Sequence, residues 1–287
     1  MADAPPASAS GGLIHLGEGL DELKGLDDPR LEPFRALRGR REDGRFIVEG
    51  ALAVERLLEQ AERFPVESLV CTPSHGARLE AALPPGVPAF VLPRKRIAEL
   101  AGFDFHRGVL ACARRPPTRA VLEPWEIEAL RRREQVTVVV ASGLADPRNL
   151  GALIRNAAAF GVDWVVVDGR GADAFARLTI RASVGNVFRV PLLVSEALPA
   201  TVEQLRRELP ATVVAATPAG ELELDALAVD RPARQIVLVG NEGAGLDEDA
   251  LARADRRVRI PVVAGADSVN VAAATAILLY ALRPRGL

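Results

Sequence analysis

Three stretches of the chain place polar side chains directly after apolar runs. The first, ADPRNLGALIRNAAAFG (residues 145–161), contains Asn149 and Arg155. The second, VLVGNEGAGLDED, contains Glu242 in a glycine-rich turn, and the third, RIPVVAGADSVNVAAATAILLY, contains Ser268 and Asn270. An arginine can bind a phosphate through two hydrogen bonds, while amides and a carboxylate can orient neighbouring groups.

Arg155 has unusually small neighbours. The apolar residues of the first stretch recur at helical spacing: Leu150, Leu153, Ile154 and Ala157. Arg155 lies on a different face of this predicted helix, where Gly151, Ala152 and Ala159 surround it. We interpret these small residues as room for a bulky ligand to approach the arginine.

Taken singly, each residue has a simpler interpretation. Asn149 fits a helix N-cap, and Arg155 fits a solvated surface position. Ser268 has no histidine partner nearby in sequence, because all three histidines lie in the first 106 residues. The glycine-rich turn matches neither the P-loop nor the dinucleotide-binding fingerprint, and Glu242 would repel a pyrophosphate. A phosphate-binding role for this turn is therefore disfavoured.

Short apolar runs alternate with helical patterns in two parts of the chain, which predicts an α/β fold. In a small unit of residues 30–114, strands are expected at 45–50, 66–72, 87–92 and 107–114, and helices at 31–41, 51–63, 76–83 and 94–101. Residues 1–29 are predicted to be a flexible tail. Proline and charge in residues 115–135 predict a linker with one helical turn.

Residues 136–287 are predicted to form a second α/β unit with a mostly parallel sheet. Its strands are expected at 136–142, 164–169, 187–193, 212–217, 235–240 and 257–262, with a closing helix at 268–283. Ligands of such sheets gather outside the carboxyl ends of the strands. All three polar stretches follow strand-like runs and are expected to meet there.

Charge is unevenly distributed although the net charge is only −2. Residues 30–120 carry 16 basic and 11 acidic residues, whereas residues 1–29 carry one basic and six acidic residues. This basic part fits nucleic-acid binding, although the preference for arginine over lysine also follows from a GC-rich coding sequence. Two cysteines, no signal-like start and no apolar run of about 20 residues predict a cytoplasmic protein with no disulfide, metal site or membrane segment.

Together, the three stretches resemble the three motifs of the SpoU/TrmH family, the RNA ribose 2′-O-methyltransferases of the SPOUT superfamily. Asn149 and Arg155 match polar positions of the first motif, Glu242 matches the second, and Ser268 and Asn270 match the third. IRASVGNVFRVP resembles the segment between the first two motifs. FIVEG and FHRGVLACA resemble the small RNA-binding domain that precedes the catalytic domain in many members.

Two positions depart from the family pattern. The third motif commonly continues Asn-Val-Ser, whereas Ala272 stands here after Asn270 and Val271. A glutamine often follows the histidine of the small domain, whereas Arg107 follows His106 here. We expect the first departure to affect packing and the second to affect contacts with RNA.

The resemblance implies a deep trefoil knot in the C-terminal unit, a bent S-adenosylmethionine as cofactor, and a homodimer through the catalytic domain. It implies that the cofactor lies against Thr217, Gly240, Asn241, Gly245, Leu246, Ile260 and Val269. The basic small domain is expected to bind RNA, and the candidates there are Arg38, Arg40, Arg41 and Arg107.

The implied reaction moves a methyl group from a sulfonium to a ribose 2′-hydroxyl. We expect Arg155 to grip a phosphate beside the target and to polarise the 2′-oxygen. The family's arginine has been suggested to act as a general base, but guanidinium groups have a reference pKa of about 12.5–13.8, which favours the electrostatic role. Asn149 and Asn270 would orient the ribose or the arginine. Glu242 would hold the arginine or the loop, and Ser268 would hydrogen-bond within the site and is not expected to be a covalent nucleophile.

Several functions fit this pattern. The leading one is methylation of large-subunit rRNA, and the alternatives within the same chemistry are tRNA or an rRNA site linked to antibiotic resistance. A non-catalytic, knotted RNA-binding protein is a further alternative, which the intact polar residues disfavour. A nucleotide-dependent enzyme with an ordinary doubly wound sheet is disfavoured by the missing phosphate-loop signatures.

Overall fold

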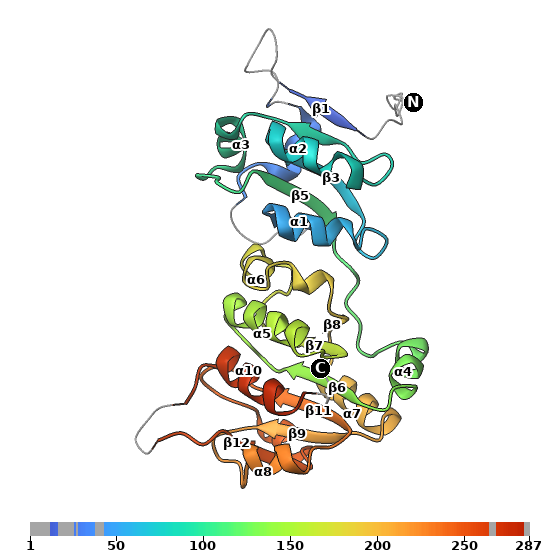
Figure 1. Cartoon of the computed structure of the whole chain (residues 1–287), viewed down its shortest axis with the longest axis vertical. Helices are drawn as coiled ribbons and strands as arrows, with labels where there is room; N and C mark the ends of the chain where they lie inside the picture. The colour runs from blue at the N-terminus through green and yellow to red at the C-terminus, as the bar shows by residue number, and fades with distance from the viewer. Residues whose placement is uncertain (1–11, 17–25, 27, 38–42, 264–267, 284–287) are drawn as a thin grey trace. The chain divides into compact units, whose positions relative to one another are not determined.

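The chain folds into two compact units that divide between Pro116 and Pro117 in the computed structural model (Figure 1). The structure describes residues 12–16, 26, 28–37, 43–263 and 268–283. Each unit has its own sheet and its own helices. The predicted α/β class is confirmed.

The first unit contains a five-stranded mixed sheet in the order β1-β4-β3-β5-β2. Its strands are β1 (Leu13–His15), β2 (Arg45–Glu49), β3 (Val66–Cys71), β4 (Ala89–Val91) and β5 (Val109–Arg114). Strand β5 is antiparallel to β2 and β3, whereas β4 is parallel to β3 and β1. The helices are α1 (Ala51–Leu58), α2 (Pro73–Leu79), η3 (Glu80–Ala82) and α3 (Arg94–Ala101).

Two parts of the first unit differ from expectation. The helix predicted at 31–41 is a 3₁₀ helix, η2 (Pro29–Phe34), because Pro33 inside it has no N–H to donate. Residues 38–42 of that predicted helix lie outside the described residues. Strand β1 falls within the predicted tail, and it pairs in parallel with β4, with Leu13 opposite Ala89.

The second unit contains a sheet of seven parallel strands in the order β10-β12-β9-β11-β6-β7-β8. The strands are β6 (Val136–Ala141), β7 (Trp164–Asp168), β8 (Leu192–Ser195), β9 (Thr212–Ala216), β10 (Leu222–Glu223), β11 (Arg234–Val239) and β12 (Arg256–Arg259). Strands β6 and β7 are buried throughout, as a parallel sheet covered on both faces requires. The predicted parallel sheet is therefore confirmed, whereas the trefoil knot stays a prediction.

The strand predicted at 187–193 is mostly wrong. A 3₁₀ helix, η4 (Asn186–Phe188), occupies its first two residues, and β8 begins only at Leu192. Pro191 cannot donate a ladder hydrogen bond, so the strand starts after it.

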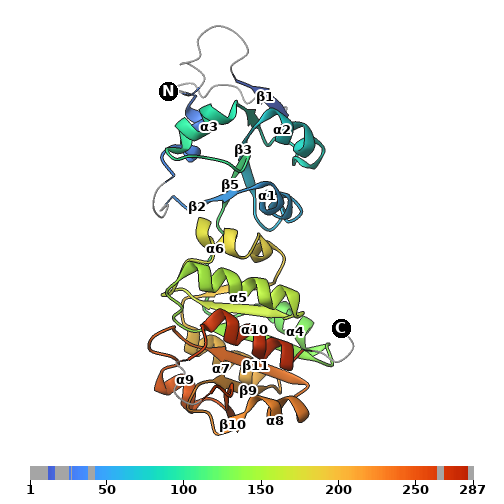
Figure 2. The same cartoon turned by 60° about the vertical axis from the view of Figure 1, so that its left-hand side comes forward.

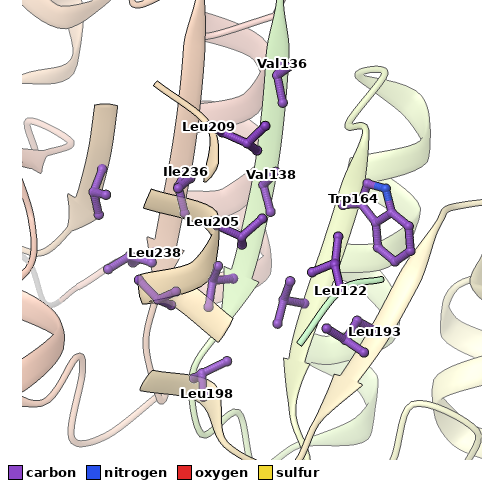
Figure 3. Packing of buried hydrophobic residues seen from close by; sticks show 14 of the residues in the cluster. Leu122, Val136, Val138, Trp164, Leu193, Leu198, Leu205, Leu209, Ile236 and Leu238 are labelled. Carbon is purple, nitrogen blue, oxygen red and sulfur yellow. The ribbon is translucent and has the colours of Figure 1, made fainter. Parts of the chain in front are cut away.

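Helices cover both faces of this sheet. Val136 and Val138 of β6 pack with Leu205 and Leu209, at the end of α7 (Leu198–Glu208), in a core that also contains residues of α4 (Pro124–Arg131) (Figure 3). The alternate residue Thr137 points to the other face, where α5 (Pro147–Ala159) lies beside α10 (Val271–Ala281) (Figure 2). Helices α6 (Arg177–Ala182), α8 (Leu224–Val229) and α9 (Glu248–Ala252) complete the unit.

Most of the stretch expected to be a linker packs against the second unit. Arg119 donates hydrogen bonds of 2.9 and 3.0 Å to the two carboxylate oxygens of Glu126, which is buried. The backbone N–H and carbonyl of Leu122 both bond the side-chain amide of Gln204 in α7. Where the chain divides into independently folding domains stays a prediction.

Across the described ranges, no helix combines the length and the apolar character needed to cross a membrane.

Candidate functional site

The three polar stretches lie at the carboxyl ends of neighbouring strands. The loop before α5 follows β6, and the glycine-rich turn follows β11, which pairs with β6 in parallel from Arg234 opposite Val136 to Val239 opposite Ala141. The third stretch leads into α10, which packs against α5. Parallel pairing thus brings residues about 100 positions apart to one edge of the sheet.

Glu242 holds the loop that precedes α5. Its Oε2 accepts a hydrogen bond of 3.1 Å from the backbone N–H of Ala145, and its Oε1 accepts one of 3.3 Å from that of Asp146. The same Oε1 accepts a bond of 2.9 Å from Nδ2 of Asn149. Of the two expected roles of this carboxylate, holding the loop or holding the arginine, these contacts support the loop.

The side-chain amides of the site continue this chain of hydrogen bonds. Nδ2 of Asn270 donates to Oδ1 of Asn149 at 3.1 Å. Oδ1 of Asn270 caps α10 by accepting from the backbone N–H groups of Ala272, at 2.9 Å, and Ala273, at 3.3 Å. A continuous series of hydrogen bonds therefore runs from Glu242 through Asn149 and Asn270 to the start of α10.

Asn149 does not cap its own helix. Asp146 is the N-cap of α5, because its carboxylate accepts a hydrogen bond of 2.8 Å from the backbone N–H of Arg148. The capping interpretation of Asn149 is therefore wrong. Its side chain lies between Glu242 and Asn270, which are 93 and 121 positions away from it in the sequence.

The donors around Glu242 favour its charged form. Partial burial raises the pKa of the carboxyl. Hydrogen bonds from Asn149 and from backbone N–H groups lower it by more than burial raises it, so that the pKa lies below its ordinary value of 4.5. The carboxylate is consequently ionised at neutral pH. A negative group at this position suits a cationic or neutral ligand better than a pyrophosphate.

Arg155 and Ser268 lie exposed at the site. Within the described part of the chain, neither side chain makes a hydrogen bond, and Arg155 makes no ion pair. Arg155 is thus not held by Glu242. Its guanidinium is available to a ligand, as the sequence predicts. Gly265 of the third stretch lies outside the described residues.

Gly151 has a different role from the one expected. A Cβ atom on Gly151 would lie 2.5 Å from the backbone oxygen of Thr179 and 2.6 Å from Cβ of Ala182, both in α6. The small size of this residue therefore lets α6 pack closely on α5 and does not leave room for a ligand. Of the three small neighbours of Arg155, only Ala152 and Ala159 are at least partly open to solvent.

We predict that Gly151→Ala lowers the free energy of unfolding by about 1–3 kcal/mol, because a new methyl group must push two backbones apart. Chemical denaturation measures this change. Gly243→Ala is the matched control, since its Cβ would meet nothing closer than 3.6 Å. Equal stability of both variants would contradict the packing role of Gly151.

The residues expected to bind the cofactor lie at the ends of β9, β11 and β12, which are neighbours in the sheet. Thr217 and Ile260 follow β9 and β12, Leu246 is buried beside the turn after β11, and Val269 directly precedes Asn270. These positions offer mainly backbone groups and aliphatic side chains. Together with the ionised Glu242 of the same turn, such groups suit a molecule with apolar and cationic parts.

The glycine-rich turn is folded tightly on itself. Asn241 and Gly245 exchange two backbone hydrogen bonds of 3.0 Å, and a Cβ on Gly240 would lie 2.3 Å from the carbonyl carbon of Gly245. The side chain of Asn241 donates to the carbonyl of Gly143 at 2.8 Å and accepts from two N–H groups of its own turn. The family resemblance implies a contact between Asn241 and the cofactor. In the structure, the side chain of Asn241 ties the turn to the loop after β6.

The first unit supplies one described candidate for binding RNA. Arg107 is exposed, and its Nε lies 3.4 Å from Oε1 of the buried Glu49. Three further predicted contacts, Arg38, Arg40 and Arg41, lie outside the described residues.

One residue of the site, Asn156, was not predicted from the sequence. Nδ2 of Asn156 donates a hydrogen bond of 2.9 Å to the carbonyl of Ala272 and so joins α5 to the first turn of α10. Its only signal in the sequence was an amide on the helix face next to Asn149. No group of three or more His, Cys, Asp or Glu side chains suited to a metal ion occurs among the residues that the structure describes.

Comparisons with known proteins agree with this geometry. The sequence profile described as the SpoU rRNA Methylase family matches residues 136–280. An uncharacterized tRNA/rRNA methyltransferase of Mycobacterium bovis is 38% identical over 275 residues, covering 92% of each chain. The 23S rRNA (guanosine(2553)-2'-O)-methyltransferase RlmP of Bacillus subtilis is 27% identical over 92% of this chain and 100% of its own.

A solved structure resembles the chain in three dimensions as well. The AdoMet-bound rRNA methyltransferase from Sinorhizobium meliloti is 26% identical and has a TM-score of 0.73. The match covers 96% of this chain and 100% of that chain, so the likeness extends over both units.

Proposed function

This chain belongs to the SpoU rRNA methylase family, and from that premise we propose that it methylates the ribose 2′-hydroxyl of a nucleotide in large-subunit rRNA. The observation that carries the proposal is an exposed Arg155, which has no partner among the described residues and lies six positions beyond Asn149; Asn149 is hydrogen-bonded to Glu242 and Asn270. The RlmP relative, whose name specifies 2′-O-methylation of 23S rRNA, supports this substrate.

S-adenosylmethionine supplies an activated methyl group when it is bound. The close approach of Gly240 to Gly245 and the ionised Glu242 in the same turn fit this cofactor, which carries no phosphate and has a cationic sulfonium. Thr217, Ile260 and Val269 would line its site. Because the leaving group is already activated, the protein has to align the hydroxyl and stabilise its developing negative charge.

Arg155 would bind the phosphate next to the target ribose and polarise the 2′-oxygen. Asn149 and Asn270 fix each other's orientation, and Ser268 lies two residues from Asn270 with its hydroxyl exposed to donate. Glu242 holds the loop under Asn149 and so keeps the amides in place. In this proposal the proton of the 2′-hydroxyl passes to water, and the guanidinium keeps its own protons throughout.

We further propose that two copies of the chain associate through α10. This helix is apolar on all sides, and its outward face exposes Ala273, Ile277 and Tyr280 at a spacing of four and three residues. Ile277 is 42% and Tyr280 57% exposed. A helix that is apolar all round is normally buried, which suggests a second copy on its outer face.

The wild-type chain should therefore sediment as a dimer, and Ile277→Glu should shift it to the mass of one chain because a charge would be buried in the interface. Analytical ultracentrifugation gives both masses. Val229→Glu, at another exposed apolar position, is the control and should leave the dimer intact. A monomeric wild type would overturn this proposal.

Methyl transfer by the wild-type chain tests the proposed function directly. Isotope-labelled S-adenosylmethionine is offered with unmodified transcripts of 23S rRNA, 16S rRNA and tRNA, and the labelled nucleotide is identified by mass spectrometry. We expect label on one 2′-oxygen of 23S rRNA. Label on tRNA alone would replace the substrate, and cofactor binding without transfer to any RNA would contradict the enzymatic assignment.

A further inference from the structure

Two arginines of the second unit lack any partner among the residues that the structure describes, and these are Arg155 and Arg181. Every other described arginine of this unit interacts with a carboxylate, a backbone carbonyl, a ring or another group of the protein. A free guanidinium is therefore unusual in this unit, and both instances are exposed. Two unpartnered, exposed guanidinium groups in the described part of this unit can therefore bind an anion from outside the protein.

The two free arginines lie on helices that touch. Arg155 stands one turn after Gly151 in α5, and Arg181 directly precedes Ala182 in α6. The Cβ position of Gly151 lies 2.6 Å from Cβ of Ala182 and 3.0 Å from the backbone nitrogen of Ser183. Any side chain at residue 151 would therefore clash with α6, so the two helices pack closely, and Arg155 and Arg181 extend from adjoining helix surfaces.

Both helices lack a counter-charge of their own. Helix α5 carries Arg148 and Arg155, and helix α6 carries Arg177 and Arg181, whereas neither helix contains an aspartate or a glutamate. Arg148 is neutralised by Asp146, the N-cap of α5. Arg177 also interacts with another group of the protein, which leaves Arg155 and Arg181. Two such cations attract an anion with more than one negative group, such as consecutive phosphates of a nucleic-acid strand.

The end of α6 is held in a strained and hydrogen-bonded turn. Val184 has a φ of +53°, which is rare for a β-branched residue, and Gly185 follows with a φ of +75°. The hydroxyl of Ser183 donates to the carbonyl of Ile180 at 3.0 Å, and the N–H of Gly185 donates to the same carbonyl at 2.9 Å. Such strain persists only where the surroundings enforce it, so α6 presents Arg181 from a fixed position.

We propose that Arg181 binds a phosphate of the RNA next to the phosphate bound by Arg155, and thereby positions the strand across α5 and α6. The inference rests on the proposed function, because it takes RNA as the substrate. Arg155 acts at the reacting nucleotide, whereas Arg181 fixes the strand beside it. The family resemblance covers this segment as IRASVG, but the pairing of the two arginines follows from the contact at Gly151.

The salt dependence of RNA binding tests this role. We expect Arg181→Ala to weaken binding of an unmodified 23S rRNA transcript about tenfold and to reduce the slope of log K against log salt by about 0.7, the value for one phosphate of a single strand. Arg181→Lys keeps the charge and should restore the slope. KM for the RNA should rise, while kcat, cofactor affinity and the thermal midpoint stay at their wild-type values.

Arg132→Ala is the matched control, since Arg132 is 78% exposed directly after α4, a helix on the opposite face of the sheet, and its side chain pairs with Glu128. An unchanged salt slope in Arg181→Ala would overturn the proposal, whether or not activity falls, because a structural defect would lower the thermal midpoint instead. Should the wild type bind RNA without methylating it, the proposed function would fail, while the slope would still decide the role of Arg181.

Discussion

Arg155→Ala should lower kcat/KM for methyl transfer by about 100- to 1000-fold, the effect of removing one group that stabilises charge in a transition state. The guanidinium has no internal partner among the described residues, so its removal breaks no contact that holds the fold. Transfer of labelled methyl groups to unmodified 23S rRNA measures the loss. Cofactor binding, measured by calorimetry, should stay unchanged because the expected cofactor loops follow other strands.

Two further variants make this result interpretable. Arg155→Lys keeps the positive charge but loses the planar, two-pronged donor, and we expect it to recover only part of the activity. Arg207→Ala removes an arginine that is 67% exposed and pairs with Glu208, and it should behave as the wild type. Full activity of Arg155→Ala would show that the arginine takes no part in the reaction.

The pH dependence of the lysine variant separates the two roles considered for Arg155. If the residue polarises the 2′-oxygen as a cation, activity should persist in Arg155→Lys across the neutral range, because lysine is protonated there too. A general base must instead be neutral to accept a proton. A lysine variant whose rate rises steeply only as its amine deprotonates would favour the base.

Parts of the fold were predictable because local pattern decides them. The helix predicted at 94–101 is α3, and the strand predicted at 235–240 is β11, shifted by one residue. Prolines caused two of the errors: Pro33 limits η2 to a 3₁₀ helix, and Pro191 delays the start of β8. Apolar periodicity gives the type of an element, whereas one missing N–H sets where it can begin or continue.

The meeting of the three polar stretches was predictable from sheet topology, but the partner of Glu242 was not. Both an arginine and a backbone N–H group satisfy a carboxylate, and only the three-dimensional path of the loop selects Ala145 and Asp146. Gly151 was misinterpreted for a related reason. The sequence shows that the residue is small, but its contact with α6 joins segments almost thirty residues apart.

Glu242→Gln should separate the alignment of the site from the stability of the fold. A glutamine has the shape of glutamate, but its NH₂ group would face an N–H donor at either oxygen position, since Ala145 bonds one oxygen and Asn149 the other. One donor then loses its partner, either Asn149 itself or the N–H of Ala145 in the loop that positions Asn149. We expect about a 100-fold loss in kcat/KM, the scale of a small misplacement of reacting groups.

The cost in stability should be smaller, about 1 kcal/mol, because water can reach the exposed carboxylate and its donors. The cofactor should still bind, since Asn241 and Gly245 hold the turn through bonds that do not involve the side chain of Glu242. Glu221→Gln, at a carboxylate that is 73% exposed and 3.9 Å from Arg257, is the control and should change neither quantity.

Acid should abolish the difference in stability between the wild type and Glu242→Gln. The pKa of Glu242 is lowered in the folded protein, so the ionised carboxylate contributes stability at pH values above its unfolded pKa, and this contribution is lost as the pH falls through the folded pKa. A protonated glutamate offers the loop little more than a glutamine does. Urea unfolding of both proteins at about pH 7 and in acid measures the change. A difference that persisted unchanged in acid would mean that the charge of Glu242 does not hold the loop, and the alignment of Asn149 and Asn270 would need another cause.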